Sequence, residues 1–238
     1  MSKKGGNKKQ KRFMTSKARQ RDTKGGTWAV RSIAGPFPKG RSIPLGVLLR
    51  DILDIGRNMR EAKIVLNGGK VSVNGIKRRD YRFSVGLFDL VSIEGFENDY
   101  TIIFDLTGKL LPKEIGKEKK KSKLCRIEGQ RKISGGKAQL STNDGRNIIV
   151  DDGKGFNAND SIEIEVPSQK IIKAFKFEKG ARAFIRGGKH AGQEGIIKEI
   201  KDSRKEEAIK SEKLVVIKVG SMELQTNAEN VFIMGEEK

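Results

Sequence analysis

The stretch REAKIVLNGGKVSVNG, residues 60–75, decides the fold of the amino-terminal half of this chain. It starts with a helical pattern, stops at Gly68-Gly69, and ends in a short strand before Asn74-Gly75. Asn-Gly is a preferred pair for a two-residue hairpin turn, because that turn needs positive φ at both positions. The stretch therefore predicts a compact helix–turn–hairpin unit.

Two helices are expected in this unit. Residues 42–56, SIPLGVLLRDILDIG, predict the first helix, with Ser42 as its N-cap and Pro44 in its first turn, where the missing N–H is not needed. Asn58 with Glu61 three residues later predicts a capping box at the start of the second. We expect both helices to pack on a small sheet. Apolar side chains of the first helix recur at the spacing of a buried helix face: Leu45, Leu48, Leu49 and Ile52.

The charge of the chain indicates a polyanionic partner. Its 238 residues carry 50 Lys/Arg and 30 Asp/Glu, a formal net charge of +20, and self-repulsion of that size opposes compaction. Ten Lys/Arg and one acid fall in residues 1–24, ten and three in residues 113–137, whereas residues 138–238 are neutral. This segregation indicates segments that bind phosphate. No apolar run approaches the roughly 20 residues of a membrane span, and no apolar leader indicates secretion, so we expect a cytoplasmic protein without a membrane partner.

The sequence gives no sign of catalytic chemistry. Cys125 is the only cysteine and His190 the only histidine, so a disulfide within the chain and a zinc site of cysteines are excluded. Neither a phosphate-binding GxxxxGK[ST] loop nor an HExxH motif occurs. We expect a protein that is not an enzyme and that has no metal, no cofactor and no small-molecule substrate.

Residues 1–41 predict a basic extension. Its first 26 residues have no usable hydrophobic period, so we expect this tail to be disordered alone and ordered on its partner, whereas Pro36 and Pro38 predict an extended path for the rest. A solubilising tail is the alternative. Trp28 is expected to pack against a domain surface, with stacking on a base as the other interpretation. The candidate phosphate contacts of the tail are Lys8, Lys9, Lys11, Arg12, Lys17, Arg19 and Arg21.

The remainder of the chain predicts strands. Residues 99–175 are expected to form a central β-rich domain, with a charged loop at 111–123 between its first two strands. That loop is either a solvated face or a second phosphate-binding surface. Residues 176–238 predict five short strands in a small closed barrel. The candidate contacts of the loop are Lys119, Lys120 and Lys121, and those of the barrel are Arg186, Lys189 and His190.

The pattern SIPLGVLLRD…REAKIVLNGGKVSVNG…DYRFSVGLFDLVSI resembles the RNA-binding module named after bacterial small-subunit ribosomal protein four. With its flanking PL…LRD and DY.F.VGL.D it is most similar to the archaeal and eukaryotic e-type family of small-subunit protein four. The resemblance covers about residues 35–235 and places the module at 42–98. It implies that the second helix, its following loop and the hairpin grip structured RNA. The candidate contacts of the module are Arg57, Arg60, Lys63, Lys70, Lys77, Arg78, Arg79 and Arg82.

Two details of the resemblance bear on the site. Many members of the wider superfamily carry Ser-Arg where this chain has Asn58 and Met59, so that either Arg57 or Arg60 is a candidate for the RNA contact. Gly188-x-x-x-Gly192-x-x-Gly195 in the last unit is similar to a KOW motif, although its loop alone would also serve as a simple turn.

The expected fold is α+β and mostly β: a two-helix-plus-sheet RNA-binding module, a central β domain and a carboxy-terminal SH3-like barrel with a KOW motif. The expected function is that of a structural component of the small ribosomal subunit, with ribosomal RNA and neighbouring ribosomal proteins as partners. A free RNA-binding factor in RNA processing or translation control is the alternative.

Overall fold

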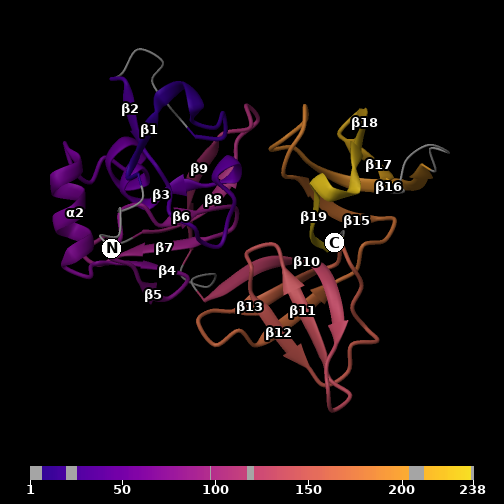
Figure 1. Ribbon diagram of the computed structural model, residues 1–238. Coiled ribbons are helices and arrows are strands. Elements are labelled where there is room, and N and C mark those ends of the chain that lie inside the picture. Colours follow the sequence, from indigo (N-terminus) through magenta and orange to yellow (C-terminus); the bar gives the residue numbers. More distant parts are fainter. Residues whose placement is uncertain (1–6, 20–25, 97, 117–120, 204–211, 237–238) are drawn as a thin grey trace. The chain divides into compact units, whose positions relative to one another are not determined.

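Strands far outnumber helices in the computed structural model (Figure 1), which confirms the expected mostly β fold. The chain divides into two compact units. The first comprises residues 1–103 and 109–121, and the second comprises residues 104–108 and 122–238. The structure describes residues 7–19, 26–96, 98–116, 121–203 and 212–236.

The first unit is built on a five-stranded sheet with the order β5-β4-β7-β8-β9. Asn74 and Gly75, with φ of 52° and 76°, form the expected tight turn between β4 and β5. β8 and β9 extend the sheet beyond residue 98, so the boundary expected there falls inside a continuous sheet. Part of the expected charged loop is strand β9. The strands are β4 (Val71–Val73), β5 (Ile76–Lys77), β7 (Leu90–Ile93), β8 (Asp99–Phe104) and β9 (Leu110–Ile115).

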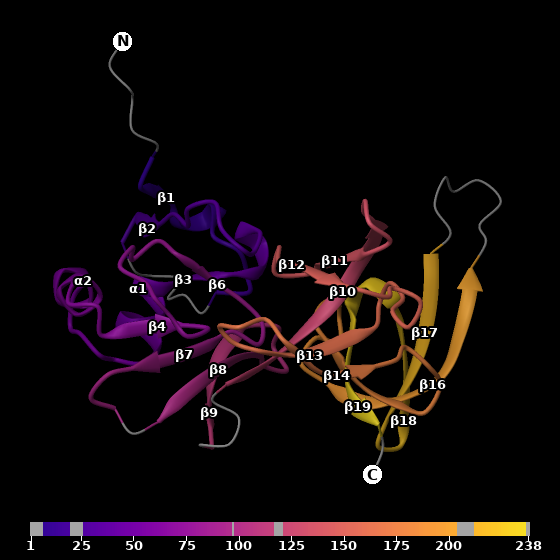
Figure 2. The ribbon, with the colours of Figure 1, turned by 90° about the horizontal axis from the view of Figure 1, so that it is seen from below.

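The second expected helix is present as α2 (Met59–Asn67), which lies beside β4 in Figures 1 and 2. The side chain of Asn58 accepts hydrogen bonds from the backbone N–H groups of Arg60 and Glu61, at 2.9 and 3.0 Å. The carboxylate of Glu61 accepts one from the N–H of Arg57 at 2.9 Å. The predicted cap is therefore confirmed, and such a cap stabilises a helix by about 1 kcal/mol.

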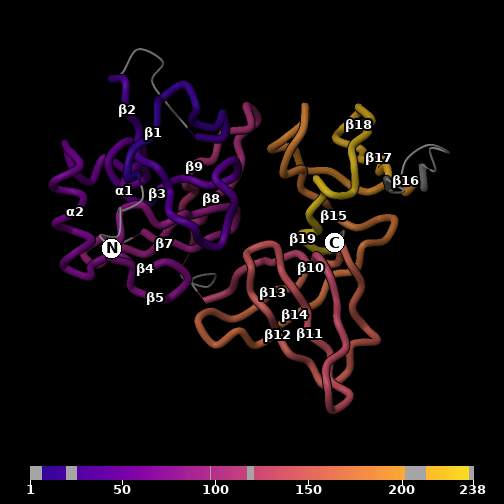
Figure 3. The backbone as a smooth tube through the Cα atoms, in the orientation of Figure 1, coloured from indigo at the N-terminus to yellow at the C-terminus, as the bar shows by residue number. Residues whose placement is uncertain are grey.

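The first helix is shorter than expected. Residues 42–56 divide into β3 (Ile43–Pro44), α1 (Leu45–Val47) and a π-helical turn at Leu48–Ile52, and the first two are labelled in Figure 3. β3 pairs with β6 (Ser84–Val85). The N–H groups of Leu45 and Gly46 donate to carbonyl oxygens of a distant segment, at 2.8 Å each, so Ser42 is not used as an N-cap.

The apolar alternation of SVGLFDLVSI, residues 84–93, predicts a strand pair. β6 instead pairs with β3, and β7 pairs with β4 and β8. The two segments therefore join different sheets, and the apolar alternation alone did not distinguish their partners.

Residues 7–19 are structured, contrary to the expectation for the tail. β1 (Lys9–Lys11) pairs antiparallel with β2 (Trp28–Val30). Arg19 is 3% exposed and donates to the carbonyl oxygens of Ser42 at 2.9 Å and Val30 at 3.2 Å, and also to the hydroxyl of Ser32 at 2.7 Å. Burial lowers the pKa of Arg19 to about 10. This buried guanidinium ties the amino-terminal ribbon to the rest of the unit.

The second unit contains two five-stranded sheets. The first has the order β12-β11-β10-β13-β14. It places a buried ion pair between Lys123 and Asp144, at 2.6 Å, next to Arg146. Its strands are β10 (Ser122–Lys132), β11 (Ala138–Thr142), β12 (Asn147–Val150), β13 (Ser161–Glu165) and β14 (Ile171–Phe175).

The second sheet of this unit has the order β18-β17-β16-β15-β19, in which β16 and β17 form the long pair seen in Figure 2. The five strands expected in residues 176–238 are all present. Arg126 on β10 donates to backbone carbonyl oxygens of residues 228, 229 and 231, and so links the two sheets. The strands are β15 (Ala181–Ile185), β16 (Glu194–Ser203), β17 (Glu212–Val219), β18 (Met222–Asn227) and β19 (Val231–Glu236).

Candidate nucleic-acid interface

Two exposed arginines flank the start of α2. Arg57 and Arg60 stand on either side of the Asn58 cap, and no described residue bonds to either guanidinium. Because the cap fixes the first turn, both side chains project from a rigid base. Both arginines are exposed, so both remain candidates for the RNA contact.

Tyr81 organises the neighbouring cations. A Cβ on Gly46 would come within 2.9 Å of the Cβ of Tyr81 and of the Sδ of Met59, so only glycine lets these segments approach so closely. The ammonium of Lys63 lies 4.2 Å from the centre of the Tyr81 ring. Lys63 is therefore half-buried and held in place by a cation–π contact rather than extended into solvent.

The hairpin carries a second group of cations. The buried side chain of Asn74 donates to Asp89 at 2.8 Å and accepts from the N–H of Leu90 at 3.0 Å, which anchors the turn. Lys70 and Arg79, before β4 and after β5, are exposed and have no bonded partner among the described residues.

The other hairpin cations already have partners inside the protein. Lys77 forms an ion pair with Glu94 at 2.7 Å. The guanidinium of Arg78 lies 4.4 Å from the centre of the Phe83 ring. Both side chains were candidate phosphate contacts, and a phosphate would have to compete with their present contacts.

Arg82 is also paired, with Asp80 at 3.0 Å. Desolvation acts to raise the pKa of Asp80, but hydrogen bonds from the side chain and backbone of Arg82 outweigh it, and the pKa lies below its ordinary value. Hydrogen bonding to Lys77 likewise lowers the pKa of Glu94. Both ion pairs therefore stay charged at neutral pH.

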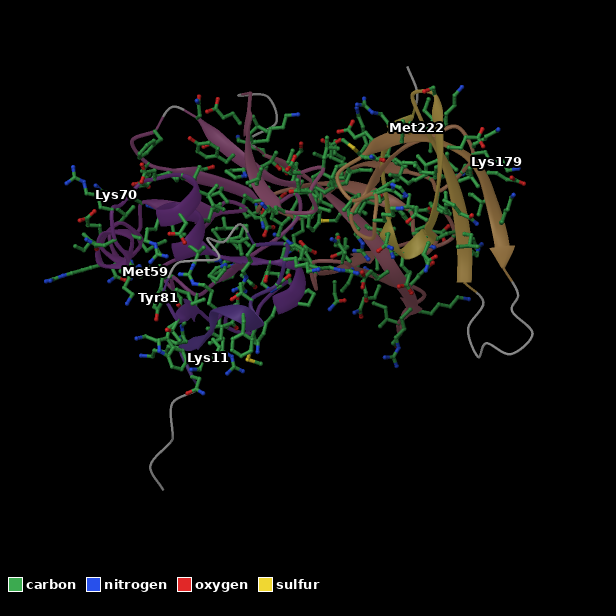
Figure 4. The ribbon with its side chains drawn as sticks, turned by 90° about the horizontal axis from the view of Figure 1, so that it is seen from above. Lys11, Met59, Lys70, Tyr81, Lys179 and Met222 are labelled. Atoms are coloured by element: carbon green, nitrogen blue, oxygen red, sulfur yellow. The ribbon has the colours of Figure 1, made fainter. Side chains whose placement is uncertain are left out.

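The amino-terminal ribbon continues this surface. The N–H of Ile33, which follows β2, donates to the carbonyl oxygen of Arg82 at 3.1 Å, and Lys8 is close enough to Asp80 to lower its pKa. Figure 4 shows Lys70, Met59, Tyr81 and Lys11 following one another along one side of the first unit. We call the exposed cations of residues 8–11, of the start of α2 and of the hairpin with its flanking residues the basic edge: Lys8, Lys9, Lys11, Arg57, Arg60, Lys70 and Arg79.

The remaining tail candidates differ in their surroundings. Lys17 is exposed, whereas Arg12 is half-buried and donates to the carbonyl oxygen of Gly26 at 2.6 Å. Arg19 is buried and serves the fold, so we leave it out of the proposed interface. Arg21 lies outside the described residues.

The described candidates between residues 121 and 190 differ in their surroundings. Arg186 points inward, donating to the carbonyl oxygen of Glu229 at 2.8 Å and lying 3.6 Å from the carboxylate of Glu128. Lys189 is exposed and His190 half-buried on the glycine loop. Lys121 is exposed, and the candidates outside the described residues are Lys119 and Lys120.

Sequence reasoning missed several members of this region. Tyr81 and Asp80 position two of the cations, Lys63 and Arg82, and the alternation of charged and aromatic residues in DYRF, residues 80–83, is the signal that indicates such a cluster. Lys39 and Arg41 are exposed on a 3₁₀ turn, whose Gly40 carbonyl accepts a hydrogen bond from Ser16 at 2.6 Å. This bond brings them near Lys17, a proximity that the sequence does not reveal.

Within the described part of the chain, no group of three or more His, Cys, Asp or Glu side chains is arranged to hold a metal ion. Over the same residues, no helix has the length and apolar character needed to cross a membrane.

Comparisons with known proteins identify the family. Residues 96–171 match the model of the ribosomal family S4e. The chain is 38% identical to small ribosomal subunit protein eS4 of Methanosphaera stadtmanae, over 100% of this chain and 96% of that protein. It is 37% identical to the protein of the same name from Archaeoglobus fulgidus, over 95% of this chain and 93% of that protein.

A solved structure agrees with these matches. The crystal structure of the 30S ribosomal protein S4e from Thermoplasma acidophilum superposes with a TM-score of 0.70 at 30% identity, covering 83% of this chain and 96% of that one. These relatives are ribosomal proteins, which agrees with the expectation that the chain is not an enzyme. The resemblance drawn from the sequence is confirmed: the chain belongs to the ribosomal protein family S4e.

Proposed function

We propose that this chain is a structural component of the small ribosomal subunit, in the cytoplasm, and that it binds ribosomal RNA chiefly through the basic edge. The observation that carries the proposal is a set of exposed cations on rigid elements of the first unit, several of which have no bonded partner among the described residues. Such cations are held at fixed spacing, so binding a folded polyanion costs little ordering entropy.

The individual elements have distinct roles in this proposal. The start of α2 and the hairpin, residues 57–82, act as the RNA-binding module that the family resemblance implies. Arg57, Arg60, Lys70 and Arg79 contact phosphates directly. Lys63 and Arg82 act with Tyr81 to orient the RNA backbone, because their own charges are already partly satisfied.

Residues 176–238 are proposed to be an SH3-like barrel with a KOW-type loop. The loop offers Lys189 and His190, while Arg186 holds its base in place through Glu229. With a neutral total over residues 138–238, this region is suited to neighbouring ribosomal proteins as well as to local RNA contacts.

Gradient sedimentation of a native cell extract in low salt tests the proposal. The chain is expected to sediment with the small subunit and to leave it as salt is raised, since phosphate contacts weaken with salt. A chain that stays at the top of the gradient, or sediments with smaller RNAs, would instead support the free RNA-binding factor.

A further inference from the structure

The β1–β2 ribbon carries an aromatic side chain in an unusual position. Trp28, the only tryptophan of the chain, is 54% exposed rather than packed against a domain surface as the sequence analysis expected. In the register of the ribbon it lies directly opposite Lys11, and the Lys11 ammonium lies 4.5 Å from the centre of its ring. Because about half of the indole is exposed to solvent, Trp28 is not a core residue.

The two lysines of the ribbon lie on the same face as Trp28. Residues directly opposite in an antiparallel pair, and residues two apart on a strand, point to the same side. Lys9, Lys11 and Trp28 therefore occupy one face, and all three are exposed. Gln10 and Ala29 occupy the other face, where Gln10 donates to the hydroxyl of Thr15 at 3.2 Å. The outward face thus combines an aromatic ring with two cations.

The surroundings of this face fit an anionic ligand. The described residues 7–19 and 26–50 contain ten Lys/Arg and no Asp or Glu. Phe13, 78% exposed, and Met14, 69% exposed, lie in the 3₁₀ turn that follows β1 and add apolar surface. A cationic surface with exposed aromatic side chains is the combination by which proteins bind single-stranded nucleic acid, with bases stacked on rings and phosphates held by cations.

We propose that Trp28 is a stacking site for one unpaired base of RNA, with Lys9 and Lys11 holding the phosphates on either side of that base. The inference rests on the proposed function and makes it specific: the basic edge binds folded RNA by its phosphates, whereas this ribbon selects an unpaired nucleotide next to it. Stacking tolerates any base, so the site distinguishes single from double strands rather than one sequence from another.

The single tryptophan makes the site directly observable. The probes are an adenine strand of about eight nucleotides, an abasic strand of equal length with the same phosphates, and a fully paired RNA hairpin, each with a fluorescent label. Label anisotropy measures binding to the full-length protein in low salt, and Trp28 emission reports stacking. We expect the adenine strand to quench Trp28 in step with binding, and the abasic strand and the hairpin to bind with little quenching.

Variants separate stacking from charge. Replacing Trp28 by alanine should weaken binding of the adenine strand by about 5- to 150-fold and leave the abasic strand unaffected. Trp28→Phe should retain most of the affinity. Ile149→Ala, which truncates a 62% exposed apolar side chain on β12, is the matched control and should change neither. Thermal unfolding of each variant shows whether the fold is kept.

The outcomes distinguish this inference from the function on which it rests. If the strands and the hairpin bind but Trp28 emission is unchanged, or if Trp28→Ala weakens the abasic strand as much as the adenine strand, the stacking site is refuted and RNA binding stands. If none of the three RNA probes binds, the proposed function fails together with it.

Discussion

Neutralising three cations of the basic edge should lower both the affinity for RNA and its dependence on salt. The triple variant Arg60→Gln, Lys70→Gln and Arg79→Gln removes charges that lie on three different segments. All three side chains are exposed and have no bonded partner among the described residues, so no internal ion pair is lost. Exposed substitutions of this kind change stability by no more than about 0.5 kcal/mol.

The magnitude follows from counterion release. Each phosphate contact contributes about 0.9 to the slope of log affinity against log salt, so the slope should become shallower by about 2.7. Between 50 and 200 mM salt each contact accounts for about 3.5-fold in affinity, and three account for about 40-fold. With roughly 6–10 phosphates engaged, the unaltered protein should lose about 10³–10⁵ over the same range.

The assay is a titration of labelled small-subunit ribosomal RNA at several salt concentrations. A matched control replaces Lys173, Lys198 and Lys201, exposed cations of the second unit, by glutamine and so removes the same net charge. Lys198 and Lys201 are paired with carboxylates, and we expect the control to keep the original slope. Equal slopes in the unaltered protein and the triple variant, or an equal decrease in the control, would refute the reasoning.

Three further predictions concern the stability of the two units. Asp144→Asn removes the buried carboxylate that pairs with Lys123 and Arg146 and should destabilise the chain by about 3–5 kcal/mol in denaturant unfolding. Burial acts to raise the pKa of Asp144, but the interaction with Lys123 outweighs it, and the pKa lies below its ordinary value. The stabilisation from this ion pair is therefore complete above about pH 5 and is lost as the pH falls below about 4. The unfolding midpoint of the variant should lack this acid-dependent loss. Arg19→Ala should destabilise the first unit by about 2–4 kcal/mol and speed amide exchange in the β1–β2 ribbon, whereas unchanged exchange would mean that the guanidinium does not hold it. Gly192→Ala should cost at least about 1–2 kcal/mol in thermal unfolding, because φ is +86° and the new Cβ would meet the carbonyl oxygen of Asp105 at 2.3 Å; an unaltered midpoint would contradict that packing.

Local physics explains which elements the sequence could predict. The cap of α2 depends on Asn58 and Glu61, which are neighbours, and the turn of the hairpin depends on two adjacent residues with positive φ. The cap and the turn could therefore both be predicted from the sequence. The alternation of apolar residues likewise located most strands of the second unit.

Long-range contacts explain the misses. The first helix begins late because the N–H groups of Leu45 and Gly46 bond to residues 83 and 81, which are 38 and 35 positions away. The tail is ordered because Arg19 reaches three partners on segments 11 to 23 residues further on. Sequence spacing carries no information about either pairing.

The same limit applies to the candidate site. Composition identifies basic segments, but it cannot tell a cation that stabilises the fold from one that is available to a ligand. Arg19 and Arg186 donate hydrogen bonds to backbone carbonyl oxygens and so stabilise the fold, whereas Arg60 and Lys70 are exposed to solvent. That distinction depends on burial and partners, and so it required the structure.

Chemical labelling of lysines in the assembled particle tests the central claim most directly. Acylation followed by mass spectrometry would compare Lys8, Lys9 and Lys70 in the free protein and in the small subunit, with Lys198 and Lys201 as internal references. All five are exposed in the described structure, so each should react in the free protein. Our account predicts that the three lysines of the basic edge become protected in the particle. Equal reactivity of those three in both states would contradict it.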